Sequence, residues 1–125
     1  MEIFINNLPL FEKEIREVAE KVVKGEKLEG ELSITFIDDA QMEELNKKFR
    51  KREGVTDVLA FAFHIPQLLG DIYICVPQAL RQKKGSILDE LKLLTVHGIL
   101  HIAGYSDETE EDRKKMREKE KEYLS

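Results

Sequence analysis

The sequence SILDELKLLTVHGILHIAG, residues 86 to 104, decides the fold, because it is apolar on nearly every face of a helix. A helix without a polar face has to be covered on several sides, so we expect it at the centre of the core. Ser86, three residues before Asp89, provides a start signal for this helix, and Gly104 provides its stop. The rest of the chain must supply the elements that cover it.

The segments before this helix predict strands and helices in alternation. Alternating or β-branched runs predict strands in residues 2–7, 31–38, 56–63 and 70–76. Apolar residues at helical spacing predict a helix from Leu10 to Gly25 and a second one that begins at Asp38 or Asp39 and runs through Phe49. Pro77 ends the last strand and can begin a short helix through Leu80.

The last segment, residues 107–124, has acidic residues in its first turn and basic residues after them, as the helix dipole favours. It predicts a surface helix whose Met116 and Tyr123 contact the core. Together these segments predict an α+β fold, a single domain over residues 1–125. We expect a mixed sheet of about four strands packed with about five helices, with any metal site on the central buried helix.

Composition limits the setting in which the chain works. With 125 residues, 42% of them hydrophobic, the chain can form one core without disulfides, and its single cysteine, Cys75, cannot make an intrachain disulfide. The start of the chain lacks the pattern of a signal peptide, and no apolar stretch reaches membrane-spanning length. We therefore expect a cytoplasmic protein that does not bind a membrane.

Charge is distributed unevenly along the chain. The net charge of -5 argues against a uniformly basic surface that would coat nucleic acid. However, five basic side chains occupy the seven positions of NKKFRKR, residues 46–52. A local basic patch is therefore compatible with the acidic total.

Two histidines of the central helix have the spacing of metal ligands. His97 and His101 are four residues apart, so on a helix both can direct a ring nitrogen at one point. Gly104 allows a sharp turn that can bring Ser106 and Asp107 back toward that point. Three protein ligands with an open fourth position would make a catalytic zinc arrangement. The alternative is that both histidines are core residues bonded to backbone carbonyls.

The residue after the first histidine bears on the reaction. A metalloprotease of the H-E-x-x-H kind needs a glutamate there to take a proton from water, and Gly98 cannot do so. Peptide hydrolysis by that mechanism is therefore disfavoured. A phosphodiester needs chiefly an activated water and positive charge near the phosphoryl oxygens.

Three stretches resemble the YbeY family of bacterial endoribonucleases. They are LNKKFRKREGVTDVLAF (residues 45–61), LGDIYI (residues 69–74) and LTVHGILHIAGYSD (residues 94–107), in the order that the family has them. The resemblance implies a metal-dependent endoribonuclease that cuts single-stranded RNA rather than DNA. It also implies a role in maturation of small-subunit ribosomal RNA and in ribosome quality control, with ribosomal components as partners.

The resemblance further implies a ligand set. Three histidines of the family bind a metal ion, taken to be zinc, and the matching positions here are His97, His101 and Asp107. The family pattern continues with Asp and then His where this chain has Ser106 and Asp107, so a carboxylate replaces the third imidazole. Zinc accepts carboxylate oxygens, and the harder donor set also suits manganese or nickel. Alternatively, Asp107 caps the last helix in a capping box with Glu110.

The same resemblance assigns Arg50 to the arginine that the family uses for activity. Its guanidinium can bind two phosphate oxygens, so we expect Arg50 to be catalytic. His97, a member of the ligand set, is the second expected catalytic residue. The alternative for Arg50 is a solvated surface charge. Phe49 is expected in the core. The basic neighbours are expected to guide RNA phosphates: Lys47, Lys48, Lys51 and Arg52.

Three further residues have two interpretations each. Asp71 points away from Ile72 and Ile74, and it either lies at the rim of the site as a proton acceptor or holds a turn. Thr56 and Asp57 either shape the cleft or cap the start of a strand.

Two other functions also remain open: a metal-dependent hydrolase of another ester or amide, and a ribosome-associated RNA-binding module with a structural metal.

Overall fold

The computed structural model describes residues 2–8, 10–51 and 53–125, so Arg52, one of the expected phosphate guides, lies outside the described residues. The strands are β1 (Ile3–Asn6), β2 (Glu31–Ile37), β3 (Val58–Ile65) and β4 (Leu68–Cys75). They form one sheet in the order β1-β2-β4-β3. β1, β2 and β4 are parallel, whereas β3 pairs antiparallel with β4 as a hairpin and forms one edge.

Five α-helices accompany the sheet in the described part of the chain. They are α1 (Glu12–Gly25), α2 (Asp39–Leu45), α3 (Val76–Gln82), α4 (Ile87–Ile102) and α5 (Glu110–Leu124). A π-helical turn, η1 (Asn46–Arg50), continues α2. The expected α+β fold with a four-stranded mixed sheet and five helices is therefore confirmed. No helix among these elements has both the length and the apolar composition needed to cross a membrane.

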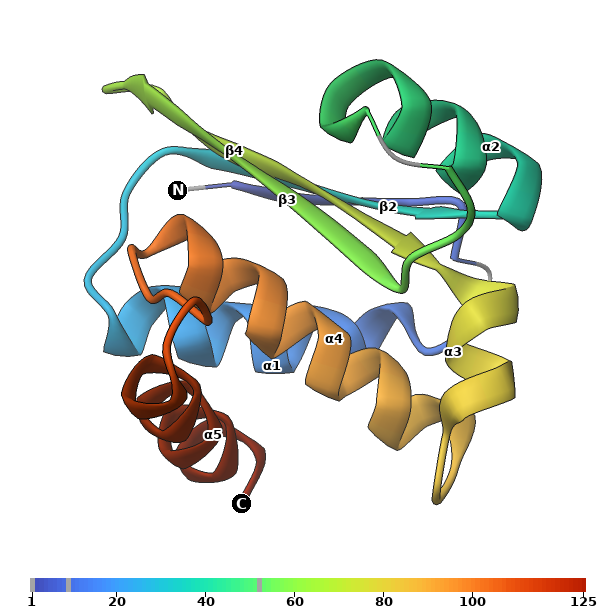
Figure 1. Cartoon of the computed structure of the whole chain (residues 1–125). Helices are drawn as coiled ribbons and strands as arrows, with labels where there is room; N and C mark the ends of the chain where they lie inside the picture. The colour runs from blue at the N-terminus through green and yellow to red at the C-terminus, as the bar shows by residue number, and fades with distance from the viewer. Residues whose placement is uncertain (1, 9, 52) are drawn as a thin grey trace.

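The helices lie on both sides of the sheet, and α4 has the central place (Figure 1). α1 and α4 lie against one face, α5 packs on their outer side, and α2 lies on the opposite face (Figure 1). α4 contacts β3, β4, α1, α3 and α5, which explains why it is apolar nearly all round. The expected central buried helix is confirmed by its buried side chains: Leu91, Leu94, Val96, Ile99 and Leu100.

Two glycines allow α4 to lie close to the sheet. A Cβ atom on Gly98 would stand 3.0 Å from Cγ2 and 3.1 Å from Cδ1 of Ile72 in β4. A Cβ atom on Gly70 of β4 would stand 2.5 Å from the Phe61 carbonyl oxygen and 2.8 Å from Cδ1 of Ile102 in α4. These close approaches hold the carboxyl-terminal half of α4, which carries the histidines, against β3 and β4.

The last helix begins later than the sequence suggested. Thr109 is its N-cap, and the Thr109 hydroxyl oxygen accepts a hydrogen bond of 3.0 Å from the backbone N–H of Asp112. The alternative role of Asp107, in a capping box with Glu110, is therefore wrong. Gly104, with φ at +107°, reverses the chain after α4, and the Ser106 hydroxyl then accepts from the Glu108 N–H at 3.1 Å. This extra turn delays the helix and leaves the Asp107 carboxylate free of any capping role.

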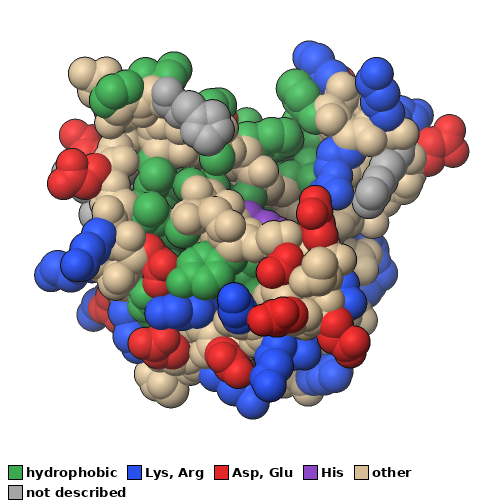
Figure 2. Space-filling model, turned by 60° about the vertical axis from the view of Figure 1, so that its left-hand side comes forward, with side chains coloured by type: hydrophobic (Ala, Val, Ile, Leu, Met, Phe, Trp, Pro, Cys, Tyr) green, Lys and Arg blue, Asp and Glu red, His purple; other side chains and the backbone are tan. Residues whose placement is uncertain are grey.

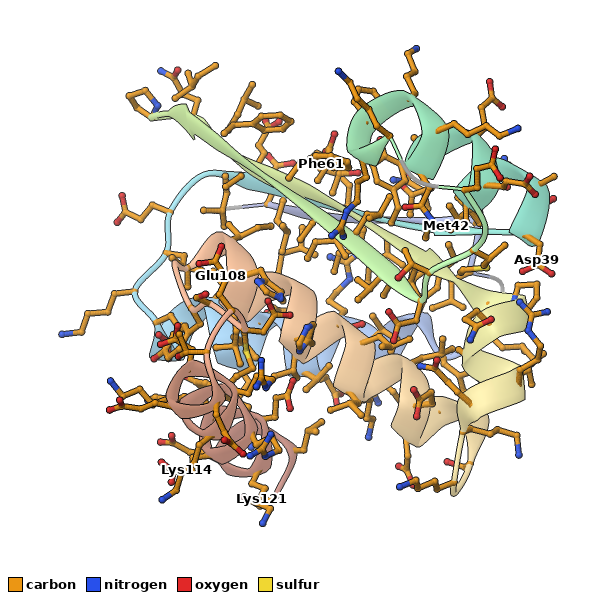
Figure 3. All side chains as sticks on the ribbon, viewed as in Figure 1. Asp39, Met42, Phe61, Glu108, Lys114 and Lys121 are labelled. Carbon is orange, nitrogen blue, oxygen red and sulfur yellow. The ribbon has the colours of Figure 1, made fainter. Side chains whose placement is uncertain are left out.

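The face of the sheet that α2 covers has a small core of its own. Ile37, Met42, Leu59 and Cys75 are buried there, so the single cysteine is a small core residue. Figure 3 shows Met42 and Phe61 on this side of the sheet. Phe49, expected in the core, is 55% exposed, so that prediction is wrong. The π-helical turn carries this ring beyond the small core and leaves it at the surface.

We expect Gly70→Ala to lower the free energy of unfolding by about 2 kcal/mol, because a backbone oxygen in the new methyl group's path cannot move without disturbing the β3–β4 pairing. Gly85→Ala is the matched control, since the nearest atom to a Cβ there is Asp89 Oδ2 at 3.6 Å. The control should be unchanged or slightly more stable. Urea unfolding of both variants measures the difference, and equal stabilities would contradict the close approach of β3 and α4 to Gly70.

Candidate metal centre

The three expected ligands lie together at the carboxyl-terminal end of α4. His97 and His101 are one helical turn apart, and their Nε2 atoms are 3.0 Å from each other. His101 Nε2 is 3.5 Å from Oδ2 of Asp107, which the turn at Gly104 brings back toward the helix. One donor atom from each residue lies within 4.8 Å of the others. The sharp turn that the sequence predicted therefore brings Asp107 to the histidine pair.

These distances fit a small tetrahedral ion. Ligand atoms about 2.0–2.1 Å from such an ion lie about 3.3 Å from one another. The distance between the two histidine nitrogens, 3.0 Å, and that from His101 to Asp107, 3.5 Å, lie on either side of this value. Two imidazole nitrogens that face each other this closely need a shared proton or a cation between them, because their lone pairs repel. Two nitrogens and one carboxylate oxygen also form a donor set that zinc accepts.

A fourth residue supports the pair from α5. Nδ1 of His97 donates a hydrogen bond of 2.6 Å to Oε2 of Glu120, whose exposed fraction is 9%. With its proton held at Nδ1, His97 presents the Nε2 lone pair toward His101 and Asp107. Sequence reasoning missed Glu120. The signal was present, however, because Met116, Glu120 and Tyr123 share the spacing of one helix face, and an acid on a buried face needs a partner.

The two histidines have opposite pKa shifts. Burial lowers the pKa of His97, but the hydrogen bond to Glu120 and the charges of Glu120, Asp57 and Asp107 raise it, and the net shift is upward. Burial lowers the pKa of His101, and the charge of His97 lowers it further. His97 is therefore the more basic member of the pair.

The donor atoms open into a cleft of about 470 Å³. Figure 2 shows histidine atoms at the base of a hollow, with Lys and Arg side chains along one rim. One wall is the edge strand β3, where the small side chains of Val58, Ala60 and Ala62 leave room. The residues that line the cleft include the predicted site residues: Arg50, Thr56, Asp57, His97, His101 and Asp107. Since the Asp107 side chain is 52% exposed, a substrate can reach the donor atoms.

The loop between η1 and β3 places Arg50 and Asp57 at the cleft. Asn46 Nδ2 donates to the Gly54 carbonyl oxygen at 2.9 Å and so closes the loop that follows Arg50. Asp57 accepts from the Val58 N–H at 2.8 Å and from Gln82 Nε2 at 2.9 Å. Both interpretations of Asp57 hold, because it caps the start of β3 and also lines the cleft.

Asp71 lies away from this cleft. It pairs with Phe61 of β3 and Ser33 of β2, and strand alternation puts its side chain on the α2 face together with Tyr73. Ile72, on the other face of β4, is the residue that meets Gly98 of α4. The proposed place of Asp71 at the rim of the site is therefore wrong. Burial on the α2 face raises the pKa of this carboxyl group, and a hydrogen bond with Tyr73 partly offsets the shift.

The fold is a small α+β domain, and its open cleft contains two histidines and a carboxylate that can hold a metal ion. These features are typical of metal-dependent hydrolases. Comparison with known proteins identifies the family. The family model described as endoribonuclease YbeY matches residues 5–125. Proteins named endoribonuclease YbeY from Bacillus thuringiensis (strain Al Hakam), Bacillus cereus (strain B4264) and Bacillus anthracis (strain A0248) are 38% identical over 128 residues, covering 88% of this chain and 82% of each relative.

A solved structure agrees with this result. The solution structure of TM1509 from Thermotoga maritima has a TM-score of 0.69 and 31% sequence identity, and the match covers 98% of this chain and 86% of that one. The chain belongs to the YbeY endoribonuclease family. It is an endoribonuclease, so its substrate is RNA.

Glu120→Leu should lower the affinity for zinc about 10- to 100-fold, because the leucine cannot hold the His97 proton at Nδ1. Glu120→Gln should lose less, since its amide oxygen can still accept the hydrogen bond without the charge. Competition with a chromogenic chelator measures both affinities. Wild-type affinity in the leucine variant would show that the contact with Glu120 does not orient the ligand.

Asp107→Ala and Thr109→Ala should separate metal binding from helix capping. Loss of the Asp107 carboxylate should lower zinc affinity more than about 100-fold, which exceeds the effect of losing a residue that only supports a ligand. The stability of the metal-free protein should change little. Loss of the Thr109 hydroxyl should cost about 1 kcal/mol of stability and leave zinc affinity unchanged. Chelator competition and urea unfolding give the two readouts. The reverse pattern would return Asp107 to a capping role.

Proposed function

We propose that this chain is a metal-dependent endoribonuclease that cuts single-stranded RNA in the cytoplasm, and that it acts in maturation of small-subunit ribosomal RNA and in ribosome quality control. The family supports the ribonuclease activity. The observation that supports metal dependence is the presence of Arg50 and the His97–His101–Asp107 group in one cleft. Zinc is the metal that this donor set suits first, and manganese or nickel are the alternatives.

Each residue of the cleft has a separate task in this proposal. His97, His101 and Asp107 would hold the ion. Bound there, a divalent cation would act as a Lewis acid toward the phosphodiester and activate water for its hydrolysis. The Glu120 carboxylate keeps the His97 proton on Nδ1, away from the donor atoms. Arg50 donates hydrogen bonds to two phosphate oxygens and stabilises the negative charge that develops on them.

The wall of the cleft decides what fits beside these groups. Val58, Ala60 and Ala62 leave space for a ribose and its phosphate along β3. Asp57 is an acid in the cleft, but its two oxygens accept hydrogen bonds from Val58 and Gln82. Its task is therefore to hold the loop in place rather than to remove a proton.

Two other functions fit the cleft less well. Hydrolysis of an amide by the H-E-x-x-H mechanism would need a glutamate in place of Gly98, and contact with Ile72 leaves no room there even for a methyl group without movement. A structural metal that only fastens the C-terminal region would not require an arginine at the mouth of the site. Arg50 nevertheless lines the same cleft as the histidines.

The test begins with metal analysis of protein purified without chelator, followed by cleavage of a single-stranded RNA oligonucleotide and of a peptide. We expect about one metal ion per chain, cleavage of the RNA alone, and loss of cleavage with chelator that added zinc restores. His97→Ala should lose both the ion and the activity. Full nuclease activity in His97→Ala would mean that a contaminant is being measured or that the site is elsewhere.

Arg50→Ala should reduce kcat about 100-fold, because it removes a donor to the charge that develops on the phosphate, and its metal content should stay at the wild-type level. Lys47→Ala is the matched control, since Lys47 lies on the same helical turn and is near Glu43 at 3.8 Å. That control should keep kcat within about twofold. If Arg50→Ala is fully active while metal removal only lowers thermal stability, the structural-metal function would replace the catalytic one.

A further inference from the structure

The exposure of Phe49 is the feature that the nuclease cleft does not explain. Phe49 and Arg50 are neighbours on η1, yet they line different hollows. Arg50 lines the cleft with the histidines, whereas Phe49 lines a groove of about 280 Å³ on the α2 face of the sheet. The π-helical turn therefore stands between the two hollows, with Arg50 lining the cleft and Lys48 and Phe49 lining the groove.

The Phe49 ring is held in place but not covered. It meets Phe61 edge-on, with ring centroids 5.4 Å apart and planes at 64°, and Phe61 meets Tyr73 in the same way at 6.0 Å and 73°. These contacts fix the orientation of the ring without enclosing it. Nζ of Lys48 lies 5.5 Å from the ring centroid. That ammonium group lies over the ring. Bases of single-stranded nucleic acids stack on oriented, exposed aromatic rings of this kind, and nearby cations attract their phosphates.

The surrounding charges favour RNA over an apolar protein partner. Lys47, Lys48, Arg50 and Lys51 are all exposed on η1 and just after it, so phosphates near this turn would be attracted. The groove itself contains polar groups from Asn7, Thr35 and Gln41, together with the carboxylate of Glu44. That carboxylate disfavours a phosphate inside the groove, but it can accept a hydrogen bond from a base amino group. The base would therefore enter the groove while the phosphates follow the basic side chains outside it.

We propose that Phe49 and Lys48 form a base-stacking subsite for a nucleotide that flanks the one whose phosphate meets Arg50. The proposal rests on the proposed ribonuclease function and extends it, because it makes the strand pass over the η1 turn from the cleft to the α2 face. Stacking needs only the face of a base, so the subsite would accept any base and would require an unpaired one. It thus provides a physical basis for the preference for single-stranded RNA.

The test compares Phe49→Leu with Phe49→Trp in steady-state cleavage of a short RNA by the metal-loaded enzyme. Leucine keeps an apolar contact with Phe61 but has no ring face, so it should raise KM about tenfold and leave kcat within about twofold. Tryptophan should keep KM near the wild-type value. Phe4→Leu is the matched control, since Phe4 is a phenylalanine on β1 that is 44% exposed and does not line the groove. It should change neither constant.

A series of RNAs with one abasic nucleotide separates stacking from a general loss of fit. In the wild type, one position that flanks the cleavage point should raise KM about tenfold, and in Phe49→Leu that same position should have no further effect. Additive losses from the abasic nucleotide and the leucine, or an unchanged KM in Phe49→Leu, would overturn the subsite.

Binding of the same RNAs in the presence of chelator, followed by fluorescence anisotropy, distinguishes the two possible failures. If the wild type binds RNA more tightly than Phe49→Leu but never cuts it, the subsite stands and the proposed function fails. If the wild type cuts RNA but Phe49→Leu binds and cuts equally well, the function stands and the subsite fails.

Discussion

The site depends on holding two imidazole rings of one helix edge to face, with a nitrogen of each close together in a partly buried position. The Nε2 atoms of His97 and His101 are 3.0 Å apart, a distance that two lone pairs do not tolerate without a proton or a cation between them. α4 can keep the rings there because it is covered by the sheet, α1, α3 and α5. The same covering elements supply the partners, since Glu120 comes from α5 and Asp107 from the turn that precedes it.

Gly98 matters both for helix packing and for the chemistry of the site. Gly98 lets α4 approach Ile72 of β4 closely. The rings of His97 and His101 therefore lie in the cleft that β3 borders. A glutamate at position 98 would place its Cβ against the Ile72 side chain, which would have to shift. Close packing at this position therefore disfavours the larger residue that a protease-type base would need. The small side chains of β3 separately form a wall along which a nucleic-acid strand can lie.

The elements were predictable where one local pattern determined them. The apolar surface of residues 86–104 predicted a central helix, and the spacing of His97 and His101 predicted a convergent pair. Local patterns failed where the position of a side chain depends on how the elements pack together. Alternation showed that Asp71 is on the face opposite Ile72, but it could not show which face the histidine helix covers. Glu120 lies 23 residues from His97, so only the docking of α5 reveals their contact.

X-ray absorption spectroscopy of the zinc-loaded protein tests the central claim most directly, because it reports the atoms bound to the ion. We expect scattering from two imidazole rings and from oxygen, with one imidazole lost in His101→Ala. A spectrum without imidazole scattering, or one with the sulfur of Cys75 bound to the ion, would contradict that claim.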